Sequence, residues 1–382
     1  MKNKFILIYF AIFFCLTWNS MQVWAAPNIS AQSAVVIEKE SGRILYEKNA
    51  EKEMPMASTT KIMTALLALE EGNLEDKITI SATAAGVEGS SMYLQEGETF
   101  TLKELLYGLM LSSGNDAAVA IAEHFGGTEA FVKKMNEKAS QLKAKHTHFA
   151  NPNGLPDDTH YSTALDMANI TAQALNNPAF SEITSTQTYK ISGDGKAVSR
   201  TLINHNKLLK LCEGCLGVKT GFTKAAGRCL VSAVCRNNMT LICVTLNAPD
   251  DWNDHCSLYD FLFETYHMET VVQSGRSLGT IPILDSDTTE LTATSASDFC
   301  YPLRSGEQCV TSLTLTPDLI APVSDGTECG KISVLLNGKE LASLPLKIEG
   351  SAEARPTLKK IQYNLYETLS RFYQKWLTLL GT

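Results

Sequence analysis

The sequence predicts an α+β fold for the larger part of this 382-residue chain, followed by a small all-β domain and a terminal amphipathic helix. Three observations lead to this prediction. Strand-like segments lie at both ends of residues 26–266, and helical segments lie between them. Alternating apolar residues and turn signals fill residues 268–350. In residues 357–382, apolar side chains recur every three or four positions, which is the period of a helix.

The first predicted elements are a β-hairpin and a buried helix. In SAVVIEKESGRILYEKN, residues 34–38 and 43–47 have strand character and flank the turn signal Ser41-Gly42. The segment 58–69 has apolar residues on nearly all of its faces, so we expect it to form a helix inside the core.

Two helices and a second hairpin follow. Thr101 and Glu104 have the spacing of a capping box at the start of LKELLYGLML. That helix should stop at SSGND, where Asp116 is expected to cap AAVAIAEHF. Further along, Asn237-Asn238 separates two apolar runs in GRCLVSAVCRNNMTLICVTLNA, which predicts a hairpin.

The last third of the chain has no cluster of catalytic residue types. In residues 268–350, Asn337-Gly338 signals a type I′ turn, and no Ser/His/Asp or Cys/His set is present. Residues 357–382 carry four cations against one acid, and their apolar side chains cover an arc of about 100° on one helix face. We expect this helix to lie in a membrane surface, the alternative being a helix packed on the β domain.

The N-terminus has the pattern of a signal peptide. Lys2 and Lys4 precede an apolar run, and small residues precede a predicted cut after Ala25, so residues 1–25 would be removed on export. An uncleaved anchor is the alternative, although the apolar run is short for a membrane span. Cleavage would leave 31 cations against 41 acids, a net charge of −10 that argues against nucleic-acid binding.

Nine cysteines remain after the predicted cleavage, an odd number for an exported chain. They are residues 212, 215, 229, 235, 243, 256, 300, 309 and 329. Cys212 and Cys215 have half the spacing of a zinc site, but no second pair or spaced histidine cluster completes it. We therefore expect no metal, and either a local disulfide or two free thiols at this pair.

Three short motifs indicate the chemistry. Ser58 and Lys61 form Ser-x-x-Lys at the start of the buried helix. Residues 113–115, Ser-Gly-Asn, fall in the turn between two helices, and residues 219–221, Lys-Thr-Gly, precede a strand-rich stretch. This order of motifs is the signature of active-site serine penicillin-binding proteins and β-lactamases.

The wider sequence resembles the low-molecular-mass penicillin-binding proteins that act as serine-type D-alanyl-D-alanine carboxypeptidases. Four stretches carry the resemblance: VVIEKESGRILYEKNAEKEMPMASTTKIMTALLALE, LLYGLMLSSGNDAAVAIAEHFGG, HFANPNGLPDDTHYSTALDMANI and CLGVKTGFTKAAGRCLVSAV. The resemblance covers nearly the whole mature chain. It implies a β-lactamase-like α+β domain over 26–266, a β-sandwich-like domain over 268–350, and a location on the outer face of the cytoplasmic membrane. It implies no cofactor.

The residue types explain how the first motif can work. A serine hydroxyl such as that of Ser58 is a poor nucleophile until a neighbouring base takes its proton. Lys61 lies one helical turn away on the same face and can be that base if it is neutral. Burial and a second cation, Lys219, should both lower its pKa.

Roles for the other motif residues follow from their chemistry and from the resemblance. Ser113 can relay a proton to the leaving amine, and Asn115 can hold the substrate's amide backbone. Lys219 and Thr220 should bind the terminal carboxylate, and Gly221 lets the substrate backbone approach closely. In the family, the backbone N–H groups of Ser58 and Phe222 would form the oxyanion hole.

The resemblance implies that Ser58 is acylated by a peptidoglycan stem peptide ending in D-Ala-D-Ala, and that β-lactams trap the enzyme. A β-lactamase would need a glutamate followed by asparagine four positions later, and none of Glu123, Glu129, Glu137 and Glu182 has one. A DD-endopeptidase or transpeptidase, and a non-catalytic wall-binding receptor, remain as alternatives.

Other polar residues are expected to be structural. His205 stands where some relatives carry a substrate-binding arginine, but a lone histidine is more often structural, and the same holds for His146, His148 and His160. Glu40, where relatives often have aspartate, bears on the first hairpin rather than on the site.

Overall fold

The structure is a computed structural model that describes residues 26–192 and 198–379. The predicted signal peptide, residues 1–25, lies outside the described residues. The chain divides into two compact units. The first contains residues up to 35 together with 47–232 and 243–261, and the second contains 36–46, 233–242 and the chain from 262 onward.

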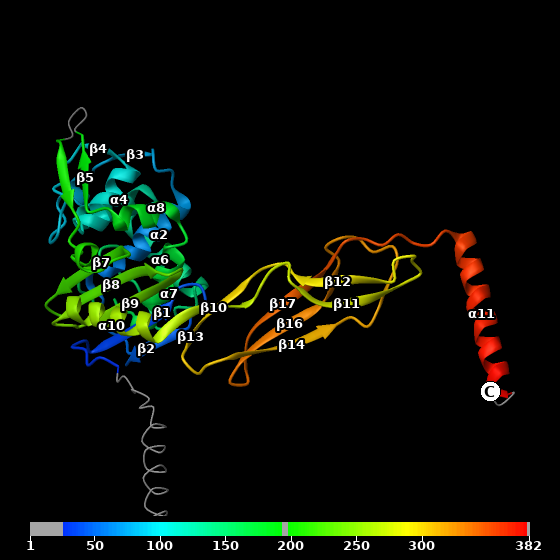
Figure 1. Cartoon of the computed structure of the whole chain (residues 1–382). Helices are drawn as coiled ribbons and strands as arrows, with labels where there is room; N and C mark the ends of the chain where they lie inside the picture. Colours follow the sequence, from blue (N-terminus) through cyan, green and yellow to red (C-terminus); the bar gives the residue numbers. More distant parts are fainter. Residues whose placement is uncertain (1–25, 193–197, 380–382) are drawn as a thin grey trace, which may run out of the picture. The chain divides into compact units, whose positions relative to one another are not determined.

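A five-stranded sheet has the order β2-β1-β9-β8-β7 (Figure 1). Its strands are β1 (Ser33–Glu38), β2 (Ile44–Lys48), β7 (Cys215–Thr223), β8 (Gly227–Arg236) and β9 (Met239–Leu246). The predicted hairpin around Asn237-Asn238 is confirmed, because both asparagines have the positive φ that such a turn requires. Strands from both ends of residues 26–266 are therefore neighbours in one sheet, which confirms the α+β prediction.

Helices surround a central buried helix, α2. Residues 61–68 of α2 (Lys61–Glu71) are all buried, as expected for a helix that is apolar on nearly every face. It packs against α4, α5, α6, α7 and α8. These helices are α4 (Leu102–Leu111), α5 (Asn115–His124), α6 (Thr128–Gln141), α7 (Ala164–Ala174) and α8 (Pro178–Ser185). Shorter helices are η1 (Ala57–Thr60), α3 (Ala82–Ala85) and α9 (Leu208–Leu211), and the long α10 (Asp251–Thr265) follows the sheet.

Two small antiparallel strand pairs complete the first unit. One consists of β3 (Lys77–Thr79) and β4 (Thr99–Thr101), and the other of β5 (Thr188–Ile191) and β6 (Arg200–Ile203). The predicted capping box at the start of α4 is present, with Thr101 Oγ1 accepting from the Glu104 N–H at 3.1 Å and the Glu104 carboxylate accepting from the Thr101 N–H at 2.8 Å.

The expected cap on the next helix is wrong. Helix α5 begins at Asn115, so Asp116 lies inside its first turn, and Gly114 is the N-cap residue. The Asp116 carboxylate instead accepts from the backbone N–H groups of Met92 and Leu94 at 3.1 and 3.0 Å. A long-range contact of this kind leaves no local signal in the sequence. It fixes the loop before β4 against the start of α5.

The second unit is built mainly from β-strands, as predicted. Strand β10 (Tyr266–Val272) pairs with β13 (Phe299–Arg304). A six-stranded sheet has the order β14-β16-β17-β12-β11-β15. These strands are β11 (Ser277–Leu284), β12 (Glu290–Ser295), β14 (Cys309–Leu315), β15 (Leu319–Ile320), β16 (Glu328–Leu336) and β17 (Lys339–Glu349). The predicted turn between β16 and β17 is confirmed, with φ of 51° at Asn337 and 79° at Gly338.

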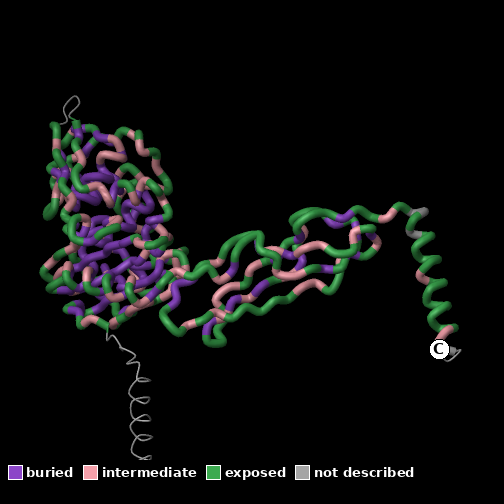
Figure 2. Tube along the Cα trace, viewed as in Figure 1, coloured by how far each residue is buried: buried purple, intermediate pink, exposed green. Residues whose placement is uncertain are grey.

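The last helix is α11 (Thr357–Leu379), and nearly all of its residues between 361 and 376 are exposed (Figure 2). The exposed fractions are 61% for Ile361, Leu365 and Leu369, 73% for Phe372 and 52% for Trp376. The prediction of an amphipathic terminal helix is confirmed. Within the described part of the chain, no helix is both long enough and apolar enough to cross a membrane.

Candidate active site

Ser58 lies in a tight turn at the entrance to the central helix. Ala57, just before it, has a φ of 49°, a left-handed conformation that costs a non-glycine residue about 1–3 kcal/mol. Two glycines allow other segments to approach this turn. A Cβ on Gly154 would lie 2.0 Å from the Ala57 carbonyl oxygen, and one on Gly221 would lie 3.0 Å from the Ser58 nitrogen. The close packing therefore holds the strained turn in place.

The Lys61 amine is completely buried and has three polar neighbours. Its Nζ lies 3.0 Å from Ser58 Oγ, 2.7 Å from Asn115 Oδ1 and 2.6 Å from the Asn153 carbonyl oxygen. Burial is the main cause that lowers its pKa well below the ordinary value, and the nearby charge of Lys219 lowers it further, against an opposing effect of Asp116.

The three oxygens around Nζ could all accept from an ammonium, and they also suit the neutral amine that a general base needs. The Asn153 carbonyl can only accept a hydrogen bond, and Asn115 Oδ1 is the acceptor end of an amide whose Nδ2 donates to the Glu88 carbonyl at 2.7 Å. A neutral amine has two N–H bonds and one lone pair, so these two oxygens use both hydrogens. In this neutral form, the lone pair can face the Ser58 hydroxyl, as a general base requires.

Lys219 is the second buried cation of the site. It lies on β7, is 1% exposed, and its Nζ donates to the Thr220 carbonyl at 2.8 Å. Burial lowers its pKa to about 7. Its charge therefore changes within the neutral pH range, and an incoming carboxylate would stabilise the protonated form.

Ser113 and Asn115 are positioned by the turn between α4 and α5. Ser113 has a φ of 59°, and the following Gly114 N–H donates to the Gly108 carbonyl at 3.1 Å. The Asn115 N–H donates to the Ser90 carbonyl at 2.7 Å. The turn thus directs the Asn115 side chain at Lys61, while Ser113 lines the same pocket as Ser58.

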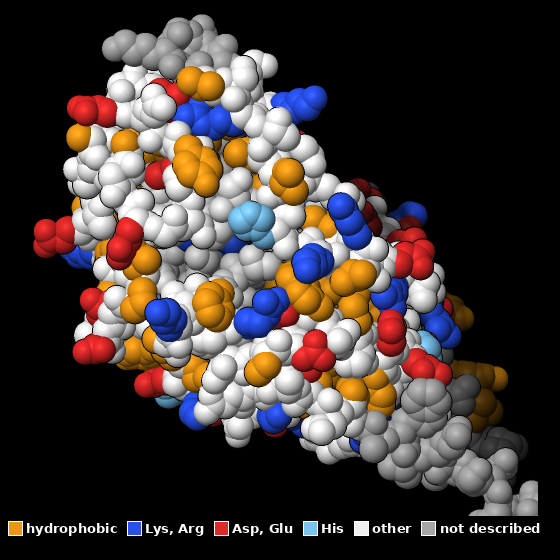
Figure 3. Space-filling model, turned by 90° about the vertical axis from the view of Figure 1, so that its left-hand side faces the viewer, with side chains coloured by type: hydrophobic (Ala, Val, Ile, Leu, Met, Phe, Trp, Pro, Cys, Tyr) orange, Lys and Arg blue, Asp and Glu red, His pale blue; other side chains and the backbone are white. Residues whose placement is uncertain are grey.

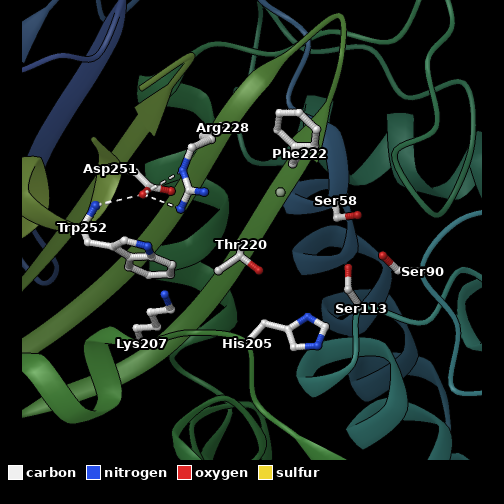
Figure 4. A pocket seen from close by; sticks show the side chains of 11 residues that line it. Ser58, Ser90, Ser113, His205, Lys207, Thr220, Phe222, Arg228, Asp251 and Trp252 are labelled. Carbon is white, nitrogen blue, oxygen red and sulfur yellow. Dashed lines mark hydrogen bonds and ion pairs between the residues drawn. The ribbon is translucent and has the colours of Figure 1, made fainter. Parts of the chain in front are cut away.

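The predicted residues converge on one pocket of about 350 Å³ (Figure 4). Of the predicted site residues, Ser58, Ser113, Thr220, Gly221 and Phe222 line it. In Figure 4 the serines lie on one side of β7. Thr220 lies between them and the side chains of Arg228 and Trp252. Figure 3 shows one face of the molecule, on which several lysine and arginine side chains lie near a histidine. Lys61, Lys219 and Asn115 lie buried around Ser58 and Thr220.

Several residues at the site were not predicted. The Asn153 carbonyl contacts Lys61, and Ser90, Lys207, Arg228, Asp251 and Trp252 line the pocket. Asn153 acts through its backbone, so its side-chain type carries no signal, although the stretch NPNG around it has the composition of a tight turn. The other unpredicted residues that line the pocket come from segments that are far apart in the sequence.

The histidines have different surroundings. His160 Nδ1 accepts from the Ala150 N–H, and its Nε2 lies 2.7 Å from Thr60 Oγ1. The ring therefore links the loop at Ala150 to the short helix that contains Ser58. Burial lowers the pKa of His160 to about 4, which keeps it neutral. His205, by contrast, lines the pocket, and burial followed by the charge of Lys219 lowers its pKa. His146 and His148 contact Glu53 and the Thr159 carbonyl.

Cys212 and Cys215 do not form a disulfide with each other, which agrees with the second of the two expected alternatives, two thiols. Cys212 Sγ lies 3.0 Å from Cys256 Sγ on α10, whereas Cys215 Sγ donates to the Gly217 carbonyl at 3.4 Å. The neighbour of Cys212 is therefore distant in sequence. Within the ranges that the structure describes, no group of three or more metal-ligating side chains is arranged to hold an ion.

Comparison with known proteins gives two family matches. Residues 20–250 match the family model described as D-alanyl-D-alanine carboxypeptidase, and residues 266–354 match the C-terminal domain of penicillin-binding protein 5. The D-alanyl-D-alanine carboxypeptidase DacF of Bacillus subtilis is 35% identical over 329 residues, which cover 83% of this chain and 84% of that protein. DacC of Escherichia coli is 31% identical over 353 residues, covering 87% and 86% of the two chains.

Solved structures agree with these matches. Penicillin-binding protein 5 of Haemophilus influenzae has a TM-score of 0.72 at 29% identity, covering 86% of this chain and 99% of that one. PBP3 of Streptococcus pneumoniae, described as a peptidoglycan synthesis regulatory factor, has a TM-score of 0.73 at 26% identity, covering 86% and 100%. Both likenesses extend over most of the chain.

Proposed function

This chain belongs to the D-alanyl-D-alanine carboxypeptidase family, and we propose that it removes the terminal D-alanine of peptidoglycan stem peptides through an acyl-enzyme on Ser58. One observation carries the proposal. The completely buried Lys61 amine lies 3.0 Å from the Ser58 hydroxyl, and burial and the nearby charge of Lys219 lower its pKa well below the ordinary value, which favours the neutral base. A serine beside a neutral buried amine is an activated nucleophile.

Acylation begins with attack of Ser58 Oγ on the carbonyl carbon of the penultimate D-alanine. Lys61 takes the hydroxyl proton, and the negative charge that develops on the carbonyl oxygen is stabilised by the N–H groups of Ser58 and Phe222. Gly221 supports this step because its lack of a side chain lets β7 lie against the nucleophile turn.

The leaving amine needs a proton before the peptide bond breaks. Ser113 lines the pocket with Ser58 and relays the proton from Lys61 to that amine. Release of D-alanine leaves an ester on Ser58, which water then hydrolyses as Lys61 acts again as the base. Asn115 holds Lys61 through Oδ1, and the second N–H of its Nδ2 remains for the amide backbone of the substrate.

The terminal carboxylate is bound by Lys219 and Thr220. The Lys219 amine is buried, donates to the Thr220 carbonyl at 2.8 Å, and has a pKa that burial lowers to about 7. A carboxylate placed above it favours the charged form and receives a charge-assisted hydrogen bond. This pair would favour a substrate that ends in a free carboxylate. A β-lactam carries a carboxylate and a strained amide, so it would acylate Ser58 in the same way.

The domain assignment and location complete the proposal. Residues 1–25 would be a signal peptide, 26–266 the catalytic domain, 268–350 a β-sandwich-like domain and 357–382 a helix on the membrane surface. The exposed apolar side chains of α11 support the membrane role. The protein would then act on the outer face of the cytoplasmic membrane.

The proposed reaction is tested by measuring D-alanine release from a peptide that ends in D-Ala-D-Ala. The full chain should release D-alanine, and its Ser58→Ala variant should not. Equal release by both proteins would show that Ser58 is not the nucleophile, and no release by either would contradict the carboxypeptidase activity.

A further inference from the structure

Four cysteines lie close together where the segment before β7 meets α10. Cys212 is the C-cap residue of α9, Cys215 begins β7, Cys243 lies on β9 and Cys256 lies on α10. The Sγ atoms of Cys212 and Cys256 are 3.0 Å apart. All four belong to the first unit, and none has a role in the acylation steps described above. We call these four residues the thiol cluster.

Burial separates the thiols that can react from those that cannot. It raises the pKa of Cys243 well above the ordinary value of a thiol, and it raises the pKa of Cys215 to about 11. Because the thiolate is the reactive form, both stay inert near neutral pH. Cys256 is partly exposed, whereas Cys212 is 6% exposed and faces Cys256. A small molecule in solution therefore meets Cys256 first, and Cys212 is placed to complete a disulfide.

Formation of that disulfide needs only a small movement. The sulfurs of a disulfide are about 2.05 Å apart, so the two Sγ atoms must approach by about 1 Å. Helix α10 is firmly held beside Cys256, because the buried ring of His255 contacts Ser232 Oγ at 2.6 Å and Thr245 Oγ1 at 2.9 Å. The movement should therefore fall mainly on the segment that carries Cys212.

The segment that carries Cys212 is less firmly held. Helix α9 has four residues, and Leu211 at its end is 60% exposed. Asn206, just before this helix, is buried, yet its Nδ2 has no hydrogen-bond partner among the residues that the structure describes. A buried donor without a partner is unfavourable, so a shift that pairs this amide would stabilise the segment.

The same segment forms part of the active-site pocket. His205 and Lys207 both line the pocket, and Lys207 is the N-cap residue of α9 (Figure 4). Trp252, in the first turn of α10, lines it as well. A link between Cys212 and Cys256 would therefore join two segments that both reach the pocket.

We propose that Cys212 and Cys256 form a thiol–disulfide exchange site, which a small external disulfide closes, and that its closure slows acylation of Ser58. This inference rests on the proposed function, because that function places the reaction in the pocket that α9 and α10 help to form. An exported chain would work in a compartment where disulfides persist. Reduction by a thiol would reverse the change.

The exchange balances with the external disulfide as the oxidant. The Cys256 thiolate attacks one sulfur of that disulfide, and the other half leaves as a thiolate. Cys212 then attacks the Cys256 sulfur of the mixed disulfide, and the second half leaves. The two protein thiols lose two protons and two electrons in total, and the external disulfide becomes two thiols.

The test compares reduced and oxidised forms of the full chain. One sample is kept in dithiothreitol, one is treated with oxidised glutathione, and one is treated and then reduced again. Hydrogen–deuterium exchange measures opening of residues 203–214, and the rate of acylation by benzylpenicillin reports on the pocket. Oxidation should slow the exchange at least about threefold, because the link restrains local opening.

The expected effect on acylation is smaller than that of a change at the reacting groups. A misplacement of about 1 Å can cost about 100-fold when it disturbs the reacting geometry. The segment lines the pocket and takes no part in the proposed steps, so acylation should be about fivefold slower after oxidation. Renewed reduction should restore the original rate.

Serine variants identify the thiols responsible. Cys256→Ser and Cys212→Ser cannot form the link, so each should match the reduced chain in all three samples, which would also show that both variants fold. Cys235→Ser is the matched control, because Cys235 is exposed on β8 and lies outside the thiol cluster. It should respond to oxidation like the unmodified chain.

Each outcome decides one of the two proposals. Equal acylation rates before and after oxidation would overturn the redox inference, and so would a response that survives in Cys256→Ser or Cys212→Ser. Acylation of the reduced chain tests the proposed function separately. If no form is acylated while oxidation still slows the exchange, the carboxypeptidase proposal and the control of acylation fail, and the exchange site alone stands.

Discussion

The two buried lysines predict an unusual pH dependence for kcat/KM. Lys61 must be neutral to accept the Ser58 proton, and its pKa lies well below the ordinary value of an amine. Lys219 must be protonated to bind the terminal carboxylate, and its pKa is about 7. The enzyme should therefore be active at neutral pH and should lose kcat/KM as the pH rises through 7 and Lys219 loses its proton.

The size of the loss follows from the interaction that disappears. A hydrogen bond to a charged group contributes about 1.5–3 kcal/mol, and about 1.4 kcal/mol corresponds to a factor of ten. Above pH 9, kcat/KM should therefore level off about 10- to 100-fold below its maximum. The assay is D-alanine release at low substrate concentration from pH 5 to pH 10.

Variants separate this account from a general effect of pH. Lys219→Met should have the low kcat/KM of the alkaline limit and should lose the decrease around pH 7. Lys224→Met, which removes an exposed lysine from the neighbouring turn, should keep the decrease. A kcat/KM that rises steadily to pH 10 would refute the reasoning, because Lys61 would then titrate like an ordinary amine.

Three further predictions follow from the packing, the cysteines and the tail. Gly154→Ala should lower the free energy of unfolding by about 2–4 kcal/mol in chemical denaturation and should reduce D-alanine release. The reason is that the new Cβ would lie 2.0 Å from the Ala57 carbonyl oxygen, in the turn that carries Ser58. A variant as stable as the wild type would contradict this close contact. Oxidation of the reduced chain with oxidised glutathione should link Cys212 to Cys256, whose sulfurs lie 3.0 Å apart; a Cys212–Cys215 peptide in the mass spectrum would contradict this pairing. Deleting residues 357–382 should abolish sedimentation with anionic lipid vesicles and leave D-alanine release near normal; a truncated protein that still sediments would show that another surface binds.

Local sequence patterns predicted the elements that depend on neighbouring residues. The capping box of Thr101 and Glu104 and the turn at Asn337-Gly338 are formed by residues within a few positions of each other. The buried helix after Ser58 could also be predicted, because apolar residues cover nearly all of its faces. These features need no information about the rest of the fold.

The features that were missed depend on contacts between distant segments. Asp116 was expected to cap a helix, but its carboxylate binds backbone N–H groups more than twenty positions earlier. Cys212 meets Cys256 rather than the nearby Cys215. In the same way, the Asn153 contact with Lys61 is made by a backbone carbonyl, which any residue type provides.

The site itself was partly predictable. The three motifs located the residues that surround Ser58, since each motif sits at a turn or strand whose local pattern is clear. The left-handed Ala57 and the close approach of two glycines could not be read from the motifs, because they result from packing of β7 and the 151–154 loop on the turn. Lys207, Arg228 and Trp252 likewise line the same pocket only because the fold brings their segments together.

The most direct test of the central claim is the position and rate of β-lactam acylation. The full chain is incubated with benzylpenicillin, digested and examined by mass spectrometry, beside its Ser58→Ala and Lys61→Met variants. The account predicts one adduct on the peptide that contains Ser58, none in Ser58→Ala, and acylation at least about 100-fold slower in Lys61→Met, the usual contribution of a general base. An adduct on another peptide, or an unchanged rate without the Lys61 amine, would contradict it.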